Sequence, residues 1–141
     1  MEYLIDMIKQ HEGLRLKPYK CTADKLTIGY GRNLEDRGIT EREAEELLDN
    51  DIEAIEAQLR NSFDFYMRLS DHRKAVLIDL TFNIGLGGVK GFKNMLAALD
   101  RQDYTEAKHQ LLDSRYARQV PNRAKELADL LEGAQGSWNQ S

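Results

Sequence analysis

The first forty residues combine a helical pattern of apolar positions with a strand-like one. Four residues fall at helical spacing, the apolar Leu4, Met7 and Ile8 together with His11. This spacing predicts a short amphipathic helix over residues 3–12, which ends at Gly13. The run LTIGYG then alternates apolar and small or polar residues, and proline and glycine residues lie around it. We therefore expect a small, twisted antiparallel sheet within residues 14–35.

A long helix is predicted next. Thr40 and Glu43 are spaced as a capping box, with Glu41 adding negative charge in the first turn. The apolar stripe that follows steps by three and four residues and consists of Leu48, Ile52, Ile55 and Leu59. The helix should run to about residue 60, with its strongly charged opposite face in solvent.

The second half of the chain predicts a helical lobe. Residues 72–84 are apolar on most sides, which indicates a central buried helix, and GLGGVKG at residues 85–91 is typical of a glycine-rich loop. Two shorter helices are expected over residues 92–100 and 104–113, with a second capping box at Asp103 and Glu106. Pro121 suits the first turn of a last helix that reaches about residue 131, with Gly133 beyond its end.

The order of these elements indicates an α+β fold. A small sheet lobe (residues 13–40) and a helical lobe (residues 60–141) are joined by the helix of residues 40–60, and residues 1–12 are expected to pack on the helical lobe. This layout makes a single domain with a cleft between its lobes, and clefts of this kind are common binding sites.

Composition narrows the class of protein. The 141 residues are 41% hydrophobic and 31% charged, which fits a soluble globular chain and excludes a disordered one. The net charge of −4 does not favour nucleic acid binding, so an anionic polymer would have to meet local basic residues. One cysteine excludes an internal disulfide, and the three widely spaced histidines form no metal pattern. We expect no cofactor.

Two features bear on location. No apolar run approaches the roughly 20 residues of a membrane span, and the N-terminus lacks the basic start and apolar run of a signal peptide. We expect the protein to accumulate in the cytoplasm without inserting into a membrane, so that a substrate outside the membrane would require a separate release step.

Glu12 is the first candidate for chemistry. It lies in the last turn of the first predicted helix, beside Gly13. The partial negative charge of a helix C-terminus disfavours a second negative charge, so an uncompensated carboxyl there keeps its proton more readily, as a general acid must. The alternative is an exposed glutamate without a function, which is the commoner case for such a position.

Thr27 and Cys21 are the next candidates. By the period of two, Thr27 shares a strand face with Gly29 and Gly31, where a ligand could approach the backbone closely, although the glycines could equally serve curvature. A lone cysteine is usually a small buried hydrophobe. Cys21, however, has polar neighbours in a predicted loop, and the charge of Lys20 would favour its thiolate.

Spacing connects these three residues. Eight residues separate Glu12 from Cys21, and five separate Cys21 from Thr27. This pattern resembles the active centre of the phage-type lysozymes, in which glutamate, aspartate or cysteine, and threonine follow one another at these intervals. Four segments of the sequence carry the same resemblance: HEGLRLKPYK with LTIGYG, ITEREAEELLDNDIEAIEAQLRN, FNIGLGGVKGF and SRYARQVPNRA. The similarity covers nearly the whole chain, which lacks one insertion before the long helix that the T-even phage enzyme contains.

The resemblance implies a catalytic set of Glu12, Cys21 and Thr27. Glu12 would be the general acid, and Arg123 is expected to approach and hold it. A free thiol is mostly neutral at pH 7, so Cys21 could act as a base once ionised, orient water together with Thr27, or attack as a nucleophile. Asp24 could supply a carboxylate instead, although ordinary turn chemistry explains it more simply.

The resemblance also implies residues that contact the sugar. Phe82 and Asn83 match family positions that face the substrate, whereas core packing is the alternative for Phe82. Arg32 and Arg115 are expected to meet carboxylates of the substrate's peptides. Gln110 matches an asparagine of the T-even enzyme, while Asn33 and Met95 replace a leucine and a serine there. Trp138 is as well explained by packing of the tail as by sugar contact. The candidate substrate-binding residues are therefore Arg32, Phe82, Asn83, Gln110, Arg115 and Arg123.

The implied activity is hydrolysis of the β-1,4 bond between N-acetylmuramic acid and N-acetylglucosamine in peptidoglycan, causing lysis of the host cell. The expected partners are peptidoglycan glycan strands, with a monomeric protein and a holin needed for release from the host cytoplasm. Lytic transglycosylation is one alternative, although Cys21 and Thr27 suit the handling of water. A catalytically silent wall-binding protein is a second alternative, because a neutral thiol is a poor substitute for a carboxylate. A helical regulatory domain without a sugar site is a third.

Overall fold

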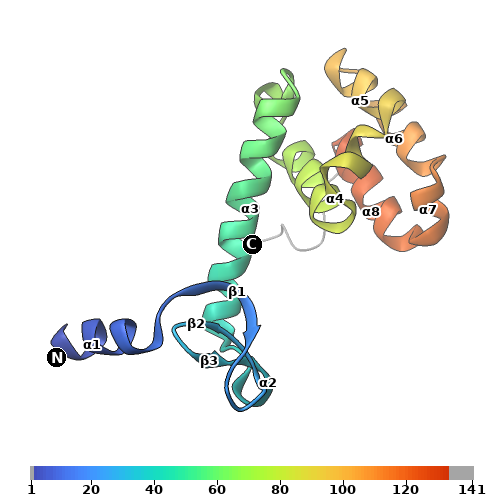
Figure 1. Cartoon of the computed structure of the whole chain (residues 1–141). Coiled ribbons are helices and arrows are strands. Elements are labelled where there is room, and N and C mark those ends of the chain that lie inside the picture. The colour runs from blue at the N-terminus through green and yellow to red at the C-terminus, as the bar shows by residue number, and fades with distance from the viewer. Residues whose placement is uncertain (1, 134–141) are drawn as a thin grey trace. The chain divides into compact units, whose positions relative to one another are not determined.

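The structure, a computed structural model, describes residues 2–133 (Figure 1). Its backbone contacts divide the chain into two compact units, Met1–Leu48 and Asp49–Ser141. The boundary falls inside the long helix α3 (Glu41–Ser62), which contributes residues to both units. The expectation that residues 1–12 pack on the helical lobe concerns two different units, and it stays a prediction.

The N-terminal unit contains the small sheet. Its elements are α1 (Glu2–Glu12), β1 (Arg15–Lys20), β2 (Leu26–Gly29), β3 (Arg32–Asn33) and α2 (Leu34–Arg37). The strands are antiparallel in the order β1-β2-β3, with Lys20 opposite Leu26 and Ile28 opposite Arg32. The predicted antiparallel sheet is therefore confirmed.

A tight loop joins β1 to β2. The backbone N–H of Asp24 donates to the Cys21 carbonyl at 2.8 Å, and the N–H of Cys21 donates to the Lys25 carbonyl at 3.0 Å. Asp24 has a φ of 60°, in the left-handed region that closes a three-residue hairpin loop and that aspartate tolerates better than most residues. Cys21 thus occupies the first position of a hydrogen-bonded turn.

The strand predicted from LTIGYG is shorter than its pattern suggests. It ends at Gly29, and the chain reverses before β3 because Gly29 and Gly31 have φ values of 70° and 81°. The period-two assignment of Gly31 to the strand face of Thr27 is therefore wrong. Positive φ at two glycines turns the backbone where a regular strand would have continued.

The helices after the sheet begin at side-chain caps. The side chain of Asn33 accepts the N–H of Asp36 at 3.1 Å and starts α2, a short helix that the sequence pattern did not predict. The capping box before α3 is confirmed: the Thr40 N–H donates to Glu43 Oε1 at 2.8 Å, and the Glu43 N–H donates to Thr40 Oγ1 at 3.1 Å.

The second unit is helical. Beyond its part of α3 it contains the 3₁₀ turn η1 (Tyr66–Arg68), α4 (Asp71–Lys90), α5 (Lys93–Asp100), α6 (Tyr104–Leu112), α7 (Arg115–Gln119) and α8 (Pro121–Glu132). Helix α8 contacts α4, α6 and α7, and α5 contacts α6. The largest fully buried side chains of this core are Tyr66, Leu59, Leu77, Leu80, Met95, Leu99, Leu111 and Leu131. With the small sheet of the first unit, this helical core confirms the α+β class.

Helix α4 is longer than predicted. The segment 85–91, expected as a glycine-rich loop, is helical through Lys90 apart from one break at Gly85, with φ 78° and ψ 166°. Gly88 is required by packing, since a Cβ there would lie 2.9 Å from Cγ1 of Ile84. The glycines therefore serve one break and one close contact, and the loop prediction is wrong.

The remaining helix boundaries largely follow the sequence. Asp103 accepts the N–H of Glu106 at 3.1 Å, but its own N–H donates to the Ala98 carbonyl at 2.8 Å, so the second capping box forms in one direction. Helix α8 starts at Pro121 and ends before Gly133, whose φ of 116° is a left-handed cap, as predicted.

No single helix in residues 2–133 has the length and apolar composition to cross a membrane. The pair α4 and α5 meets that test together, by length and composition alone, with a bend of 97° between them.

Arg73 links three helices of the second unit. From α4, its Nε donates to the Leu131 carbonyl of α8 at 2.7 Å, and its guanidinium carbon lies 3.4 Å from the centre of the Tyr104 ring of α6. The Leu131 carbonyl is in the last turn of its helix, where carbonyls lack a partner within the helix. Arg73 therefore supplies that partner and stacks on an aromatic ring at the same time.

We expect Arg73→Ala to lower the free energy of unfolding by about 1–3 kcal/mol, because it removes a charge-assisted hydrogen bond and a cation–π contact. Arg68→Ala is the matched control. It removes an exposed pair with Asp100 at 3.0 Å, whose side chains are 57% and 63% exposed, and should cost less than about 1 kcal/mol. Urea unfolding measures both, and equal losses would contradict the role given to Arg73.

Candidate active site

The three residues picked out by their spacing all lie in the N-terminal unit. Glu12 is the last residue of α1, Cys21 begins the β1–β2 loop, and Thr27 is on β2 opposite Tyr19. The sheet and its first loop therefore place Cys21 and Thr27, while the end of α1 places Glu12.

Glu12 lies against the turn between β2 and β3. A Cβ built on Gly31 would be only 2.7 Å from Oε2 of Glu12 and 3.2 Å from its Cδ. Two reasons therefore require glycine at position 31. A side chain would collide with Glu12, and the φ of 81° is unfavourable for any residue with a side chain. The carboxyl group is exposed and packs on bare backbone, so it is open to a ligand while one side of it is supported.

Cys21 and Thr27 form a second group of the site. Thr27 is only 3% exposed, and its hydroxyl donates to the Lys25 carbonyl at 2.8 Å. Hydrogen bonds from the backbone at Lys25 and Ala23, and then from the Thr27 side chain, lower the pKa of the half-buried Cys21 thiol below its ordinary value. The thiolate is therefore more populated near neutral pH than in an ordinary cysteine.

Two expectations about this group need correction. Thr27 was expected on an open strand face, but its side chain is buried and acts through Lys25 and Cys21. Lys20 was expected to favour the thiolate by its charge, but its ammonium group pairs with Glu35 at 3.0 Å. The donors that favour the thiolate come instead from the hairpin backbone and from Thr27.

Asp24 has a clear structural role. It is exposed and holds the left-handed position of the β1–β2 loop, as turn chemistry leads one to expect. Its service as a substitute carboxylate stays a prediction.

Arg32 joins β3 to the start of α3. Its Nη1 donates to Oε1 of Glu43 at 2.7 Å and to the Gly38 carbonyl at 3.2 Å. The hydrogen bond from Arg32, together with the one from the Thr40 backbone, lowers the pKa of Glu43 to about 2. Arg32 thus fixes the connection after the sheet, and its contact with substrate stays a prediction.

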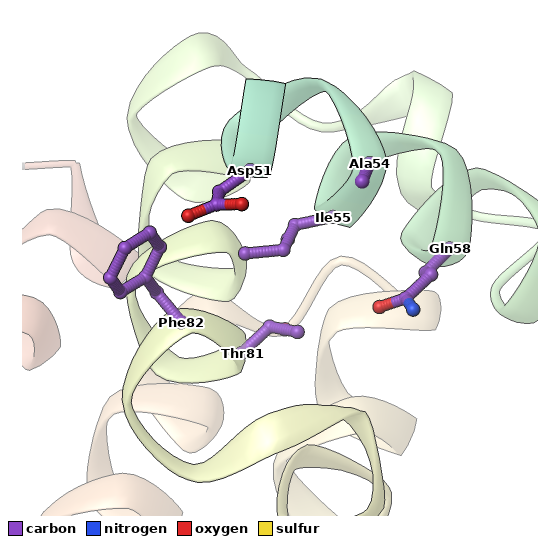
Figure 2. A pocket seen from close by; sticks show the side chains of 6 residues that line it. All are labelled: Asp51, Ala54, Ile55, Gln58, Thr81 and Phe82. Carbon is purple, nitrogen blue, oxygen red and sulfur yellow. The ribbon is translucent and has the colours of Figure 1, made fainter. Parts of the chain in front are cut away.

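Phe82 borders a hollow in the second unit. The hollow has a volume of about 300 Å³ and is lined by Asp51, Ala54, Ile55, Gln58, Thr81 and Phe82. Figure 2 shows the Phe82 ring and the Asp51 carboxylate at one end and Gln58 at the other. Phe82 is 50% exposed, so the alternative that it packs in the core is wrong. Its neighbour Asn83 is also exposed.

The other predicted contact residues lie on three helices of the same unit. Gln110 on α6 donates to Oε1 of Glu106 at 2.7 Å, and the exposed Arg115 begins α7. On α8, Arg123 donates from Nε and Nη2 to Oδ1 of Asp79 at 2.9 and 2.6 Å, which raises the pKa of its guanidinium.

The structure thus divides the predicted residues between the two units. Glu12, Cys21, Thr27 and Arg32 lie in the first, and Phe82, Asn83, Gln110, Arg115 and Arg123 in the second. The approach of Arg123 to Glu12 joins the two units and stays a prediction. Trp138 lies outside the described residues.

Sequence reasoning missed several supporting residues. Asp79 stands out only as the one charged residue in the apolar run of residues 75–89, 44 residues from the arginine that it binds. No sequence pattern points to Glu35, because its two partners lie on neighbouring strands.

Within residues 2–133, no group of three or more potential metal-ligating side chains of histidine, cysteine, aspartate or glutamate is present.

Known proteins resemble this chain over most of its length. The family described as phage lysozyme matches residues 9–131. The chain is 26% identical to "Probable T4-type lysozyme 1" of Dictyostelium discoideum, over 90% of this chain and 92% of that protein. It is 35% identical to an endolysin of Acyrthosiphon pisum secondary endosymbiont phage 1, over 72% of this chain and 69% of that protein.

The hydrogen bonds around Cys21 predict the pH profile of its alkylation. The rate with iodoacetamide should rise with pH, with a midpoint below that of a free cysteine in an unfolded peptide, because only the thiolate reacts. Thr27→Val should raise the midpoint by removing one donor. Thr22→Val, a change at an exposed position of the same loop, should leave it in place. Identical profiles for the two variants would refute the contribution of Thr27.

Proposed function

Because the chain belongs to the phage lysozyme family and is a lysozyme hydrolase, we propose that it cleaves the β-1,4 bond between N-acetylmuramic acid and N-acetylglucosamine in bacterial peptidoglycan. The observation that carries this proposal is the position of Glu12, an exposed carboxyl group that packs on bare glycine backbone in the same unit as Cys21 and Thr27. A glycosidase requires such an acid together with a group that handles water or the developing cation.

Glu12 is the proposed general acid. It gives its proton to the glycosidic oxygen as the bond to the anomeric carbon breaks, so that the leaving sugar departs as an alcohol. Its packing against Gly31 limits the directions in which the carboxyl group can turn. That restriction favours a single approach of the glycosidic oxygen.

Cys21 and Thr27 are proposed to handle water. A water molecule attacks the anomeric carbon, and the Cys21 thiolate accepts the proton that the water loses. The lowered pKa of the thiol supports this role, since a larger fraction of Cys21 is then a base at neutral pH. This route inverts the anomeric configuration and yields an ordinary reducing sugar, whereas lytic transglycosylation would leave an anhydro sugar.

The second unit is proposed to bind the glycan strand. The half-exposed ring of Phe82 offers a face on which a sugar ring can stack, and Asn83 and Gln110 offer amide groups for its polar substituents. Arg115 of this unit and Arg32 of the first unit are proposed to meet carboxylates of the peptide stems. We propose that Arg123 approaches Glu12 and holds its carboxyl group.

The biological role follows from the substrate. We propose that the protein is a monomer, accumulates in the host cytoplasm, reaches the periplasmic peptidoglycan after a holin opens the membrane, and lyses the host. The proposed role requires neither nucleic acid binding nor membrane insertion.

Glu12→Gln should lower the rate of peptidoglycan hydrolysis by at least about 100-fold, because the amide cannot donate the proton that the leaving oxygen needs. Glu2→Gln, at the other end of α1, removes the same charge and should leave the rate within about twofold. Turbidity of outer-membrane-stripped bacteria measures both. Full activity of Glu12→Gln would refute the assignment of the acid.

Cys21→Asp should remain within about tenfold of the parent, and Cys21→Ala should lose about 100-fold or more, because only aspartate replaces the base. Equal activity of the alanine variant and the parent would exclude a catalytic thiol. Mass spectrometry of the fragments released by the parent should show reducing ends. Anhydro ends would indicate a transglycosylase, and no release would indicate a silent wall-binding protein.

A further inference from the structure

One carboxylate oxygen connects the two ends of the Cys21 loop. Oε1 of Glu35 accepts a hydrogen bond from Nζ of Lys20 at 3.0 Å and another from the backbone N–H of Leu26, also at 3.0 Å. Lys20 directly precedes Cys21, and Leu26 directly precedes Thr27. Glu35 therefore binds both residues that flank the loop.

The helix that carries Glu35 is itself anchored to the sheet. Asn33, the cap of α2, lies on β3 directly opposite Thr27. Asp36, one residue beyond Glu35, lies 3.4 Å from the ammonium group of Lys25 at the end of the loop. Helix α2 thus contacts the loop through two carboxylates while its first turn is held beside Thr27.

These contacts contribute little to stability. The side chains of Lys20 and Glu35 are 58% and 38% exposed, and ion pairs at such exposure add little to the free energy of unfolding. The bond from the Leu26 N–H differs, because it fixes a backbone group beside Thr27 and is the largest cause of the lowered pKa of Glu35. The contribution of Glu35 is therefore geometric.

We propose that Glu35 is a positioning residue for the reaction, which keeps the Cys21 loop closed and so holds the backbone of Ala23 and Lys25 and the Thr27 side chain in place around the Cys21 thiol. The hydrogen bonds of Glu35 go to Lys20 and Leu26 and not to the Cys21 sulfur, so Glu35 would act through these two residues. The inference rests on the proposed function only where it assigns a catalytic use to Cys21.

Removing the charge of Glu35 and opening the loop that it closes would have opposite effects on the pKa of the Cys21 thiol. Removing the negative charge of Glu35, or freeing the positive charge of Lys20, would favour the thiolate and lower the pKa of Cys21. Opening the loop would withdraw the donors at Lys25 and Ala23 and raise that pKa. The direction of the change therefore distinguishes a positioning role from a purely electrostatic one.

The test compares Glu35→Ala with Glu35→Gln in the full chain. Alanine removes both hydrogen bonds, whereas the amide oxygen of glutamine can still accept from the Leu26 N–H. Glu41→Gln, which removes an exposed charge from the first turn of α3, is the control for charge. The first readout is the pH profile of Cys21 alkylation by iodoacetamide, which requires no catalysis.

Glu35→Ala should raise the midpoint of that profile by about half a pH unit or more, while Glu35→Gln and Glu41→Gln should stay close to the parent. In the lytic assay, kcat of Glu35→Ala should fall by about tenfold with KM within about twofold, since binding is untouched. Its melting temperature should stay within a few degrees of the parent, as expected for an exposed pair.

Two results would overturn the proposal. One is an unchanged or lowered midpoint in Glu35→Ala, and the other is a collapse of its melting temperature, which would assign Glu35 to stability instead. A raised midpoint with unchanged turnover would uphold the positioning of the thiol and refute the catalytic use of Cys21. The failure of the inference and the failure of the proposed function are thus distinguishable.

Discussion

The contact between Glu12 and Gly31 is the constraint on which the candidate active site depends. The end of α1 and the turn between β2 and β3 meet there. The Glu12 carboxyl group fits between them only because residue 31 has no side chain, and the same residue adopts a φ of 81°. The turn also ends β2 and starts β3, which leads directly into α2. One glycine therefore links the position of Glu12 to the path of the backbone beside Thr27.

Hydrogen-bond donors around the Cys21 thiol favour its thiolate form. Aspartate carries a negative charge at neutral pH without assistance, whereas a thiol needs donors to reach the same state. The hairpin supplies them from its backbone, and the buried Thr27 adds another. Because the backbone donors belong to the loop between β1 and β2, their direction depends on how that loop is closed, which is the role proposed for Glu35.

The sequence allowed the long elements to be predicted and left the exceptional backbone conformations unresolved. The stripe and capping box of α3, and the proline and glycine that bound α8, follow from repeated local preferences. The failures at Gly31 and Gly85 share one cause: a glycine pattern does not say which residue will take a positive φ and which will remain helical. Likewise, spacing selected Glu12, Cys21 and Thr27 as candidates, whereas Glu35 and Asp79 form tertiary contacts that no local pattern encodes.

The most direct test of this account compares Gly31→Ala with Gly29→Ala. Both glycines have positive φ, at 81° and 70°, so both variants should lose about 1–2 kcal/mol of stability. Only a Cβ at residue 31 would meet Glu12, because nothing lies within 4 Å of one at residue 29. The account predicts that Gly31→Ala loses at least about tenfold more lytic activity than Gly29→Ala at equal stability. Equal losses of activity would contradict it.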